Sequence, residues 1–142
     1  MPDLSFDGSA AYEADRVTRW GRVFVAVPWR VQGSTEDVVA LLDTAAEWCV
    51  VSADLGAKLG IVAEEGDPSA TMLTRHGRID GRVVRVPVQL VADEGSDVTV
   101  EATFVVSADW PALPVIGWKG LLERVRLGLD PSSQRVYFSS TS

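Results

Sequence analysis

The chain has 142 residues, 46% of them hydrophobic and 23% charged, a composition typical of one globular domain large enough to bury a core. Its formal net charge of −7 would repel nucleic acid and anionic membranes, so we expect neither as a partner. No apolar run approaches the roughly 20 residues of a membrane span, and the acidic start MPDLSFDGSAAYEADR is unlike a signal peptide, which favours a cytoplasmic location.

The first part of the chain has no sustained hydrophobic periodicity, and residues 1–18 are predicted to form a flexible arm. Residues 19–142 are predicted to form a single domain, because no linker, repeat or low-complexity tract divides them. β-Branched residues dominate GRVFVAVPWRVQG, which predicts a strand over residues 23–31. A turn follows, and then a second strand over residues 36–42.

Asp43 and Thr44 interrupt the apolar sequence at the end of this second strand. Both residue types are common in turns and helix caps, and Thr44 and Glu47 form the T-x-x-E pattern of a capping box. A helix that began there would include WCVV, whose valines and tryptophan are poor helix formers, so WCVV is predicted as a strand. The next segment, SADLGAKLG, predicts a short helix capped by Ser52 and ended by Gly60.

Alternating apolar and polar residues predict two strands in the middle of the chain, over residues 83–92 and 97–106, joined as a hairpin by the turn DEGS. Upstream, LTRHGRIDG holds two glycines among charged residues and is predicted to be an exposed hairpin tip. Downstream, VIGWKGLLERV predicts a short helix that begins near Trp118, and RVYF predicts a last strand over residues 135–138. Together these elements indicate an all-β, mainly antiparallel domain with one or two short helices.

Few residues are available for metal or thiol chemistry. One cysteine and one histidine are too few for the usual structural zinc site, and we expect neither a metal nor a cofactor. Cys49 and His76 are the residue types of a thiolate and its base. Cys49, however, lies in an apolar strand, where thiols are usually inert, and a lone cysteine cannot form an internal disulfide, which fits a reducing cytoplasm. His76, beside Gly77 in a polar loop, is expected to be solvated.

Two segments gain meaning when they are considered together. LLDTAA, at residues 41–46, is an apolar pair followed by Asp-Thr, and VIGWKGLL, at residues 115–122, is an apolar pair followed by a glycine and a predicted helix. A polar hairpin, MLTRHGRIDGRVVRV, lies between them. This order of segments resembles the retropepsin-like aspartic peptidases, which include the retroviral proteases and their bacterial relatives. The resemblance covers roughly residues 20–140.

The resemblance implies a closed β-barrel and an aspartic endopeptidase that hydrolyses peptide bonds with an activated water. Such an enzyme needs two carboxylates that share a proton. The chain contains a single Asp-Thr or Asp-Ser dipeptide, at Asp43, so the second carboxylate must come from a second copy in a twofold-symmetric homodimer. The resemblance also implies that residues 136–138 belong to an intersubunit sheet, and that a peptide or protein is the substrate.

The resemblance assigns further roles around Asp43. Thr44, Ala45 and Ala46 support the catalytic loop, and Gly117 opens the helix beneath it. The substrate-binding flap is formed by Thr74, Arg75, His76 and Gly77.

Two residues depart from the family pattern. Ala45 replaces the usual glycine; it keeps the backbone amide and carbonyl, but it adds a methyl group and disfavours positive φ. Trp118 replaces an arginine that would pair with Glu47, so the indole is expected to brace the loop by packing. Two alternatives therefore stay open: a catalytically weak or inactive dimerisation or peptide-binding module of the same fold, and an unrelated β-barrel in which Asp43 is a turn residue.

Overall fold

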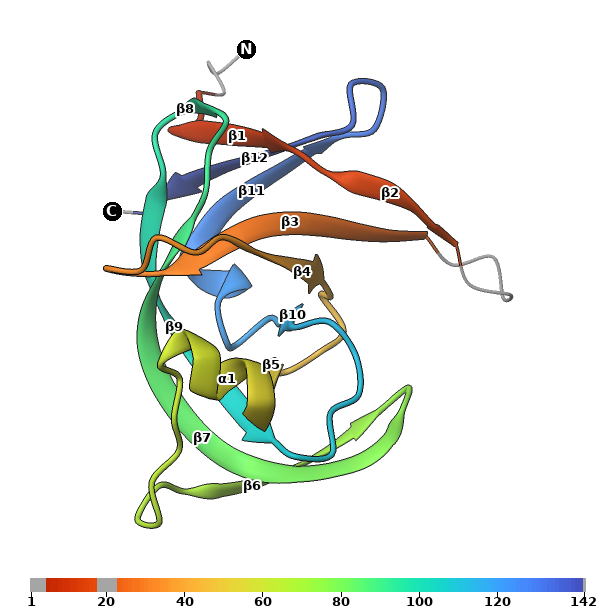
Figure 1. The fold of residues 1–142 in the computed structure, drawn as a ribbon. Coiled ribbons are helices and arrows are strands. Elements are labelled where there is room, and N and C mark those ends of the chain that lie inside the picture. The colour runs from red at the N-terminus through yellow and green to blue at the C-terminus, as the bar shows by residue number, and fades with distance from the viewer. Residues whose placement is uncertain (1–4, 18–22, 142) are drawn as a thin grey trace.

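The computed structural model describes residues 5–17 and 23–141 of the chain as a mostly β structure (Figure 1). The elements in chain order are β1 (Gly8–Ala11), β2 (Glu13–Val17), β3 (Val23–Val31), β4 (Val38–Leu42), β5 (Cys49–Ser52), α1 (Ala53–Leu59), β6 (Ser69–Thr74), β7 (Gly77–Leu90), β8 (Glu94–Gly95), β9 (Val98–Ser107), β10 (Val115–Ile116), the 3₁₀ turn η1 (Leu122–Arg124), β11 (Val125–Asp130) and β12 (Arg135–Ser140).

Most of the strands form a closed barrel. The larger sheet has the order β2-β3-β4-β10-β5-β9-β7-β6, and an additional pairing between β3 and β7 closes the ring. The long strand β7 curves out of the barrel and continues into a hairpin with β6 (Figure 1). The prediction of a closed, all-β barrel is confirmed. Two of its strand pairs are parallel, β4 with β10 and β5 with β9, which a mainly antiparallel prediction did not specify.

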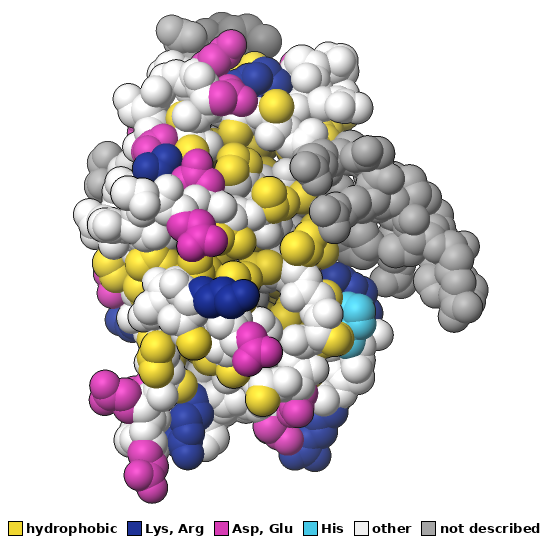
Figure 2. Space-filling view, in the orientation of Figure 1, with side chains coloured by type: hydrophobic (Ala, Val, Ile, Leu, Met, Phe, Trp, Pro, Cys, Tyr) yellow, Lys and Arg dark blue, Asp and Glu magenta, His cyan; other side chains and the backbone are white. Residues whose placement is uncertain are grey.

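The barrel is filled by aromatic and branched side chains. Trp29 on β3 and Phe104 on β9 are 1% and 0% exposed, and their rings stack with centroids 5.3 Å apart. In Figure 2, hydrophobic side chains form a band across the middle of this face, above α1, with acidic and basic side chains scattered around it. The apolar layer of the barrel therefore reaches the surface on this face.

Helix α1 has the caps that its sequence predicted. The Leu55 N–H donates to Ser52 Oγ at 3.2 Å, and Gly60 ends the helix with φ of 80°, a conformation that glycine adopts without steric cost. The predicted strands over residues 23–31, 36–42 and 97–106 are confirmed to within two residues at each end. No helix in the described part of the chain is long and apolar enough to cross a membrane.

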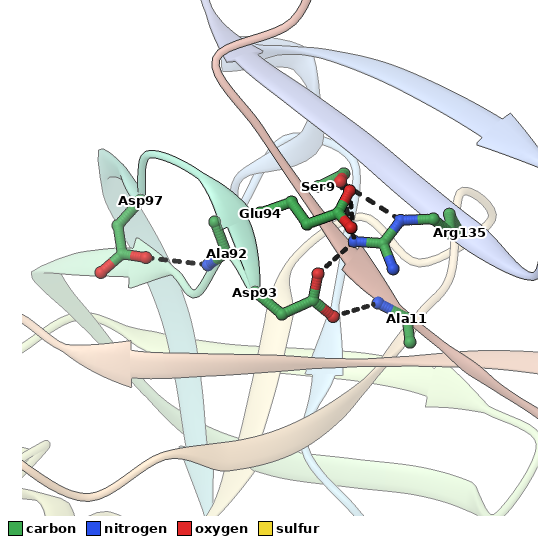
Figure 3. Close-up of polar contacts among 7 residues, drawn as sticks. All are labelled: Ser9, Ala11, Ala92, Asp93, Glu94, Asp97 and Arg135. Carbon is green, nitrogen blue, oxygen red and sulfur yellow. Dashed lines mark hydrogen bonds and ion pairs between the residues drawn. The ribbon is translucent and has the colours of Figure 1, made fainter.

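The predicted flexible arm is wrong over residues 8–17, which form β1 and β2. β1 pairs with β12 and with β8, and β2 pairs with β3. Figure 3 shows what holds β1: Arg135 on β12 contacts Ser9 Oγ at 2.8 Å and forms an ion pair with Asp93, whose carboxylate also accepts the Ala11 N–H at 2.9 Å. These partners lie far from β1 in sequence, so local periodicity carried no signal of them.

The helix predicted near Trp118 is also corrected. Residues 118–121 form a turn, and regular structure is limited to η1. The Leu121 and Leu122 N–H groups both donate to Gly117 O at 3.1 Å, which is not the bond pattern of a regular α-helix. A Cβ at Gly120 would lie 2.4 Å from Cys49 N, so only glycine fits at this position of the turn.

The last strand, β12, lies in the region expected to form an intersubunit sheet over residues 136–138, and that expectation stays a prediction. β12 lies between β11 and β1, so both of its edges are paired within the subunit. Val136 and Phe138 are 1% and 2% exposed and belong to the subunit's own core. A second chain therefore cannot pair with β12 in this arrangement.

Candidate active site

Asp43 follows directly after β4, where the two parallel strands β4 and β10 end side by side. The register places Leu41 opposite Val115 and Leu42 opposite Ile116. The Asp43 N–H donates to Ile116 O at 3.0 Å, so the pairing continues one residue past β4. The two segments on which the resemblance depended, residues 41–46 and 115–122, are therefore neighbours in space.

The Asp43 loop is a tight turn in which one amide bonds to the Asp43 carboxylate and another to the Asp43 backbone carbonyl. The Ala45 N–H donates to Asp43 Oδ1 at 3.0 Å, and the Ala46 N–H donates to Asp43 O at 3.1 Å. Among the described non-glycine residues, Gln134 alone has a positive φ, so Ala45 has a backbone conformation that alanine adopts without strain. The replacement of glycine by alanine thus keeps the amide hydrogen bond to the carboxylate.

Gly117 lies beneath this loop, where the backbone leaves no room for a side chain. A Cβ there would be 2.3 Å from Trp48 O and 2.8 Å from Ala46 O. The next residue, Trp118, donates its N–H to Ala46 O at 2.7 Å, which ties the turn after β10 to the Asp43 loop. The glycine is therefore required by close packing of the two segments.

The expected brace by the Trp118 indole is wrong, because this side chain is 49% exposed. Lys119 supplies the missing cation instead: its Nζ lies 3.3 Å from Glu47 Oε1, with both side chains about half exposed. Ion pairs of such exposure contribute little. Backbone hydrogen bonds connect the two segments more firmly, since the Lys119 and Gly120 N–H groups donate to Glu47 O at 2.8 and 3.1 Å.

The predicted flap is the hairpin of β6 and β7, with Arg75 and His76 at its tip. Thr74 Oγ1 donates to Gly77 O at 2.8 Å and accepts the His76 N–H at 3.0 Å, and Gly77 has φ of 94°. Arg75, His76 and Gly77 are exposed residues, as predicted. The tip is thus a well-formed turn that projects from the barrel.

The Arg75 side chain turns back from this tip toward the Asp43 loop. Its Nη1 atom lies 3.9 Å from Asp43 Oδ2, and the two side chains are 27% and 28% exposed. The guanidinium also lies 5.9 Å from the ring centroid of Trp110, and the His76 ring meets the same indole edge-on at 5.1 Å. Burial and the neighbouring Arg75 charge lower the pKa of His76, which favours a neutral imidazole at neutral pH.

A cleft of about 860 Å³ separates the flap from the Asp43 loop. Its lining combines the loop, the flap strand β6 and the segment before β10: Leu42, Asp43, Thr44, Ala45, Ala46, Glu47, Val50, Thr71, Met72, Leu73, Thr74, Arg75, Trp110 and Val115. Six of the predicted site residues, Asp43 to Ala46 with Thr74 and Arg75, meet in this one cleft. His76 and Gly77 stay at the flap tip, and Gly117 lies beneath the loop.

Trp110 is a cleft residue that the sequence did not single out. It is 5% exposed, and its Nε1–H donates to Leu113 O at 2.8 Å. The indole is the surface on which both flap-tip side chains rest. Its segment, SADWPALP, has no regular periodicity, so no local signal distinguished Trp110 from the other tryptophans.

Cys49 takes no part in the cleft. The residue is 0% exposed, and burial raises the pKa of its thiol to about 12, so it stays protonated and unreactive. His76 stands at the exposed flap tip, and a Cys49–His76 pair is therefore not formed. Within residues 5–17 and 23–141, no group of three or more His, Cys, Asp or Glu residues is placed to hold a metal ion.

Comparisons with known proteins show the family of the chain and its likeness in fold to a solved structure. Residues 27–130 match the family model described as aspartyl protease. The chain belongs to the aspartyl protease family. This aspartyl protease family member is also similar in fold to the crystal structure of a retropepsin-like aspartic protease from Rickettsia conorii, with a TM-score of 0.59 and 18% identity over 92% of this chain and 98% of the other. No curated protein matches the chain.

Proposed function

We propose that this family member is an aspartic endopeptidase of the retropepsin type, in which two Asp43 carboxylates, one from each subunit of a homodimer, activate water. The observation that carries the proposal is the position of Asp43. It lies in a cleft under a hairpin flap, 28% exposed, with one carboxylate oxygen held by the Ala45 amide. A carboxylate that served only as a buried cap of a turn or helix would not face a cleft of this volume.

The chemistry follows from the charge of two adjacent carboxylates. Two such groups a few ångströms apart share one proton, because both cannot ionise comfortably. The ionised member takes a proton from water, while the protonated member polarises the scissile carbonyl. One subunit offers a single carboxylate of this kind, and retropepsin-like proteases typically act as dimers on peptide substrates. Thr44, next to the axis, would hold the two loops together across it.

The cleft suggests how a substrate binds. An extended peptide between β6 and the Asp43 loop would form strand-like backbone hydrogen bonds, and the loop carbonyls and amides offer partners for it. Apolar side chains line the rest of the cleft, among them Val50, Met72, Trp110 and Val115. We therefore propose apolar side chains on both sides of the scissile bond.

The decisive experiment incubates the protein with a diverse peptide library between about pH 3 and pH 8, at concentrations where sedimentation detects a dimer. Wild type should cleave with a bell-shaped pH profile, because both carboxylates protonate at low pH and both ionise at high pH. Asp43→Asn should lose at least about a thousandfold in turnover and keep its fold and dimer.

Ala45→Gly restores the residue that the family usually has, and it tests the inactive-module alternative. Because Ala45 already donates its amide to Asp43, turnover should be equal to wild type or higher. If neither wild type nor Ala45→Gly cleaves any peptide while both are dimeric, the enzyme proposal fails and the peptide-binding module takes its place.

A further inference from the structure

Arg75 places a positive charge in a cleft that is otherwise acidic. Among the described residues that line the cleft, Arg75 alone is basic, whereas Asp43 and Glu47 are acidic. The whole chain also has a formal net charge of −7. Without a local cation, these charges would repel acidic peptides and favour basic ones. The position of Arg75 therefore decides how the cleft treats a charged substrate.

The Arg75 side chain is held inside the cleft, unlike the other arginine near the flap tip. It is 27% exposed, whereas the Arg78 side chain is 67% exposed. The guanidinium lies 5.9 Å from the ring centroid of Trp110, within the range of cation–π attraction. Trp110 is buried, and its Nε1–H donates to Leu113 O at 2.8 Å. Arg75 is thus supported by an aromatic side chain that is itself fixed.

The contact between Arg75 and Asp43 crosses the space that a substrate would occupy. Nη1 of Arg75 lies 3.9 Å from Asp43 Oδ2, so the side chain spans the cleft from the flap to the loop. In the proposed mechanism, an extended peptide passes between these elements and Asp43 faces water and the scissile carbonyl. Substrate binding therefore separates the two charges. The guanidinium then loses a charged partner while partly buried, which is unfavourable unless another anion replaces it.

We propose that Arg75 is a specificity-determining residue that binds a carboxylate of the substrate, so that the enzyme prefers peptides with Asp or Glu near the scissile bond. A guanidinium has planar N–H donors that match the two oxygens of a carboxylate. The substrate carboxylate takes the place of Asp43 as the partner of Arg75. The inference rests on the proposed function and names its class of substrate, an acidic peptide.

The acidic residue is the second residue from the scissile bond. The residues directly at the bond enter the apolar part of the cleft, around Val50, Met72 and Val115. An extended peptide advances about 3.3 Å per residue, so the Cα of the second residue lies about 5 Å from the bond. Its side chain can therefore reach a guanidinium that lies beside Asp43. A twofold homodimer has two Arg75 side chains, so the preference applies on both sides of the bond.

A peptide library tests this preference. Its members have the sequence Ala-Ala-X-Z-Z-X-Ala-Ala, in which Z is Leu, Phe, Val or Met and X is Glu, Gln or Lys. Mass spectrometry measures relative kcat/KM at about pH 6, where glutamate is ionised. Wild type should cleave Glu peptides about five- to tenfold faster than the matching Gln peptides, and Lys peptides most slowly. The net charge of the chain alone predicts the reverse order.

Substitution of Arg75 tests whether this residue causes the preference. Arg75→Gln should bring the ratio of kcat/KM between Glu and Gln peptides to about one, and Arg75→Glu should favour Lys peptides. The ratio is measured within one preparation, so a loss of folded enzyme does not change it. Arg78→Glu makes the same charge change in the same hairpin, outside the cleft lining, and should keep the wild-type ratio.

Peptide binding tests the inference independently of turnover. The same peptides are made with a reduced amide at the Z-Z bond, which resists hydrolysis, and fluorescence anisotropy measures their Kd. Glu peptides should bind wild type about five- to tenfold more tightly than Gln peptides. Arg75→Gln should lose this difference, and Arg78→Glu should retain it.

The inference is overturned if wild type does not prefer Glu peptides, or if Arg75→Gln keeps the wild-type preference. Failure of the proposed function gives a different result. If no peptide is cleaved but tighter binding of Glu peptides depends on Arg75, the proposed function alone fails. If peptides are cleaved without regard to X, this inference alone fails.

Discussion

At the scale of single residues, the site depends on close backbone contacts as much as on the carboxylate. Gly117 packs against the carbonyl groups of Trp48 and Ala46, and the adjacent Trp118 N–H bonds to Ala46 O. The same Ala46 closes the turn in which the Ala45 amide bonds to Asp43. The position of the carboxylate is thus coupled to a contact from a segment far along the chain, at Gly117 and Trp118.

Gly117→Ala is expected to destabilise the fold by about 1–3 kcal/mol or more, because the added methyl group must displace backbone atoms. Urea unfolding measures the change. Gly66→Ala is the control, since a Cβ at Gly66 meets nothing within 4 Å. Equal stability of the two variants would show that the Asp43 loop moves freely away from residue 117.

At the scale of elements, β1 and the flap are positioned by a few side chains each. β1 is clamped by Asp93 and Arg135, which reach it from the segment before β8 and from β12 (Figure 3). The flap tip contacts Trp110 and Asp43 through Arg75. Both elements should therefore respond to single polar substitutions.

The clamp on β1 should show a defined pH dependence. The Ala11 N–H and the Arg135 guanidinium hold the pKa of Asp93 below its ordinary value of 3.8. The stabilising effect of the ionised Asp93 carboxylate on the fold is therefore complete above pH 3.8, and it is lost as the pH falls through the lower pKa of the folded state. Asp93→Asn should lower the free energy of unfolding by about 0.5–1 kcal/mol at neutral pH, and this difference from wild type should shrink in strong acid. Urea unfolding across the pH range checks it, with Glu101→Gln, exposed on β9, as the control.

The flap should be more mobile than the hairpin of β7 and β9, because a lid has to open for an extended substrate to enter. Hydrogen exchange should be faster at residues 74–77 than at residues 98–106. Arg75→Gln removes the contacts with Asp43 and Trp110, so exchange at the tip should rise about two- to fivefold. Arg78→Gln, in the same hairpin, breaks an ion pair with Asp80 in which both side chains are largely exposed and should have no such effect. Identical exchange in the two variants would exclude Arg75 as the contact that restrains the flap.

At the scale of the whole molecule, one subunit is half of the proposed site. Each chain contributes a single Asp43, and we propose that the second carboxylate comes from a second chain. Catalysis and assembly should therefore be coupled, since dissociation separates the two carboxylates.

Turnover per chain should accordingly fall on dilution through the dimer Kd, as measured by sedimentation of a species near twice the chain mass of 15.3 kDa. Mixing wild type with excess Asp43→Asn should suppress activity, because most wild-type chains then pair with a chain that lacks the carboxylate. Activity that is proportional to concentration down to the monomer, and is unaffected by the Asn variant, would mean that a single chain holds the full catalytic apparatus.

The sequence by itself determined most of the strands, the caps of α1 and the two segments that meet at the Asp43 loop. Alternation predicted the strands, Ser52 and Gly60 predicted the caps of α1, and LLDTAA with VIGW predicted that Asp43 and Gly117 belong together. Tertiary structure alone decided that β1 is clamped by Arg135, that β12 is enclosed within its sheet, that Lys119 pairs with Glu47, and that Trp110 supports the flap. The physical reason is the distance in sequence between the residues that make contact. Periodicity and caps report contacts between neighbours in the chain, whereas a strand's partners and a loop's packing depend on segments that only the folded barrel brings together.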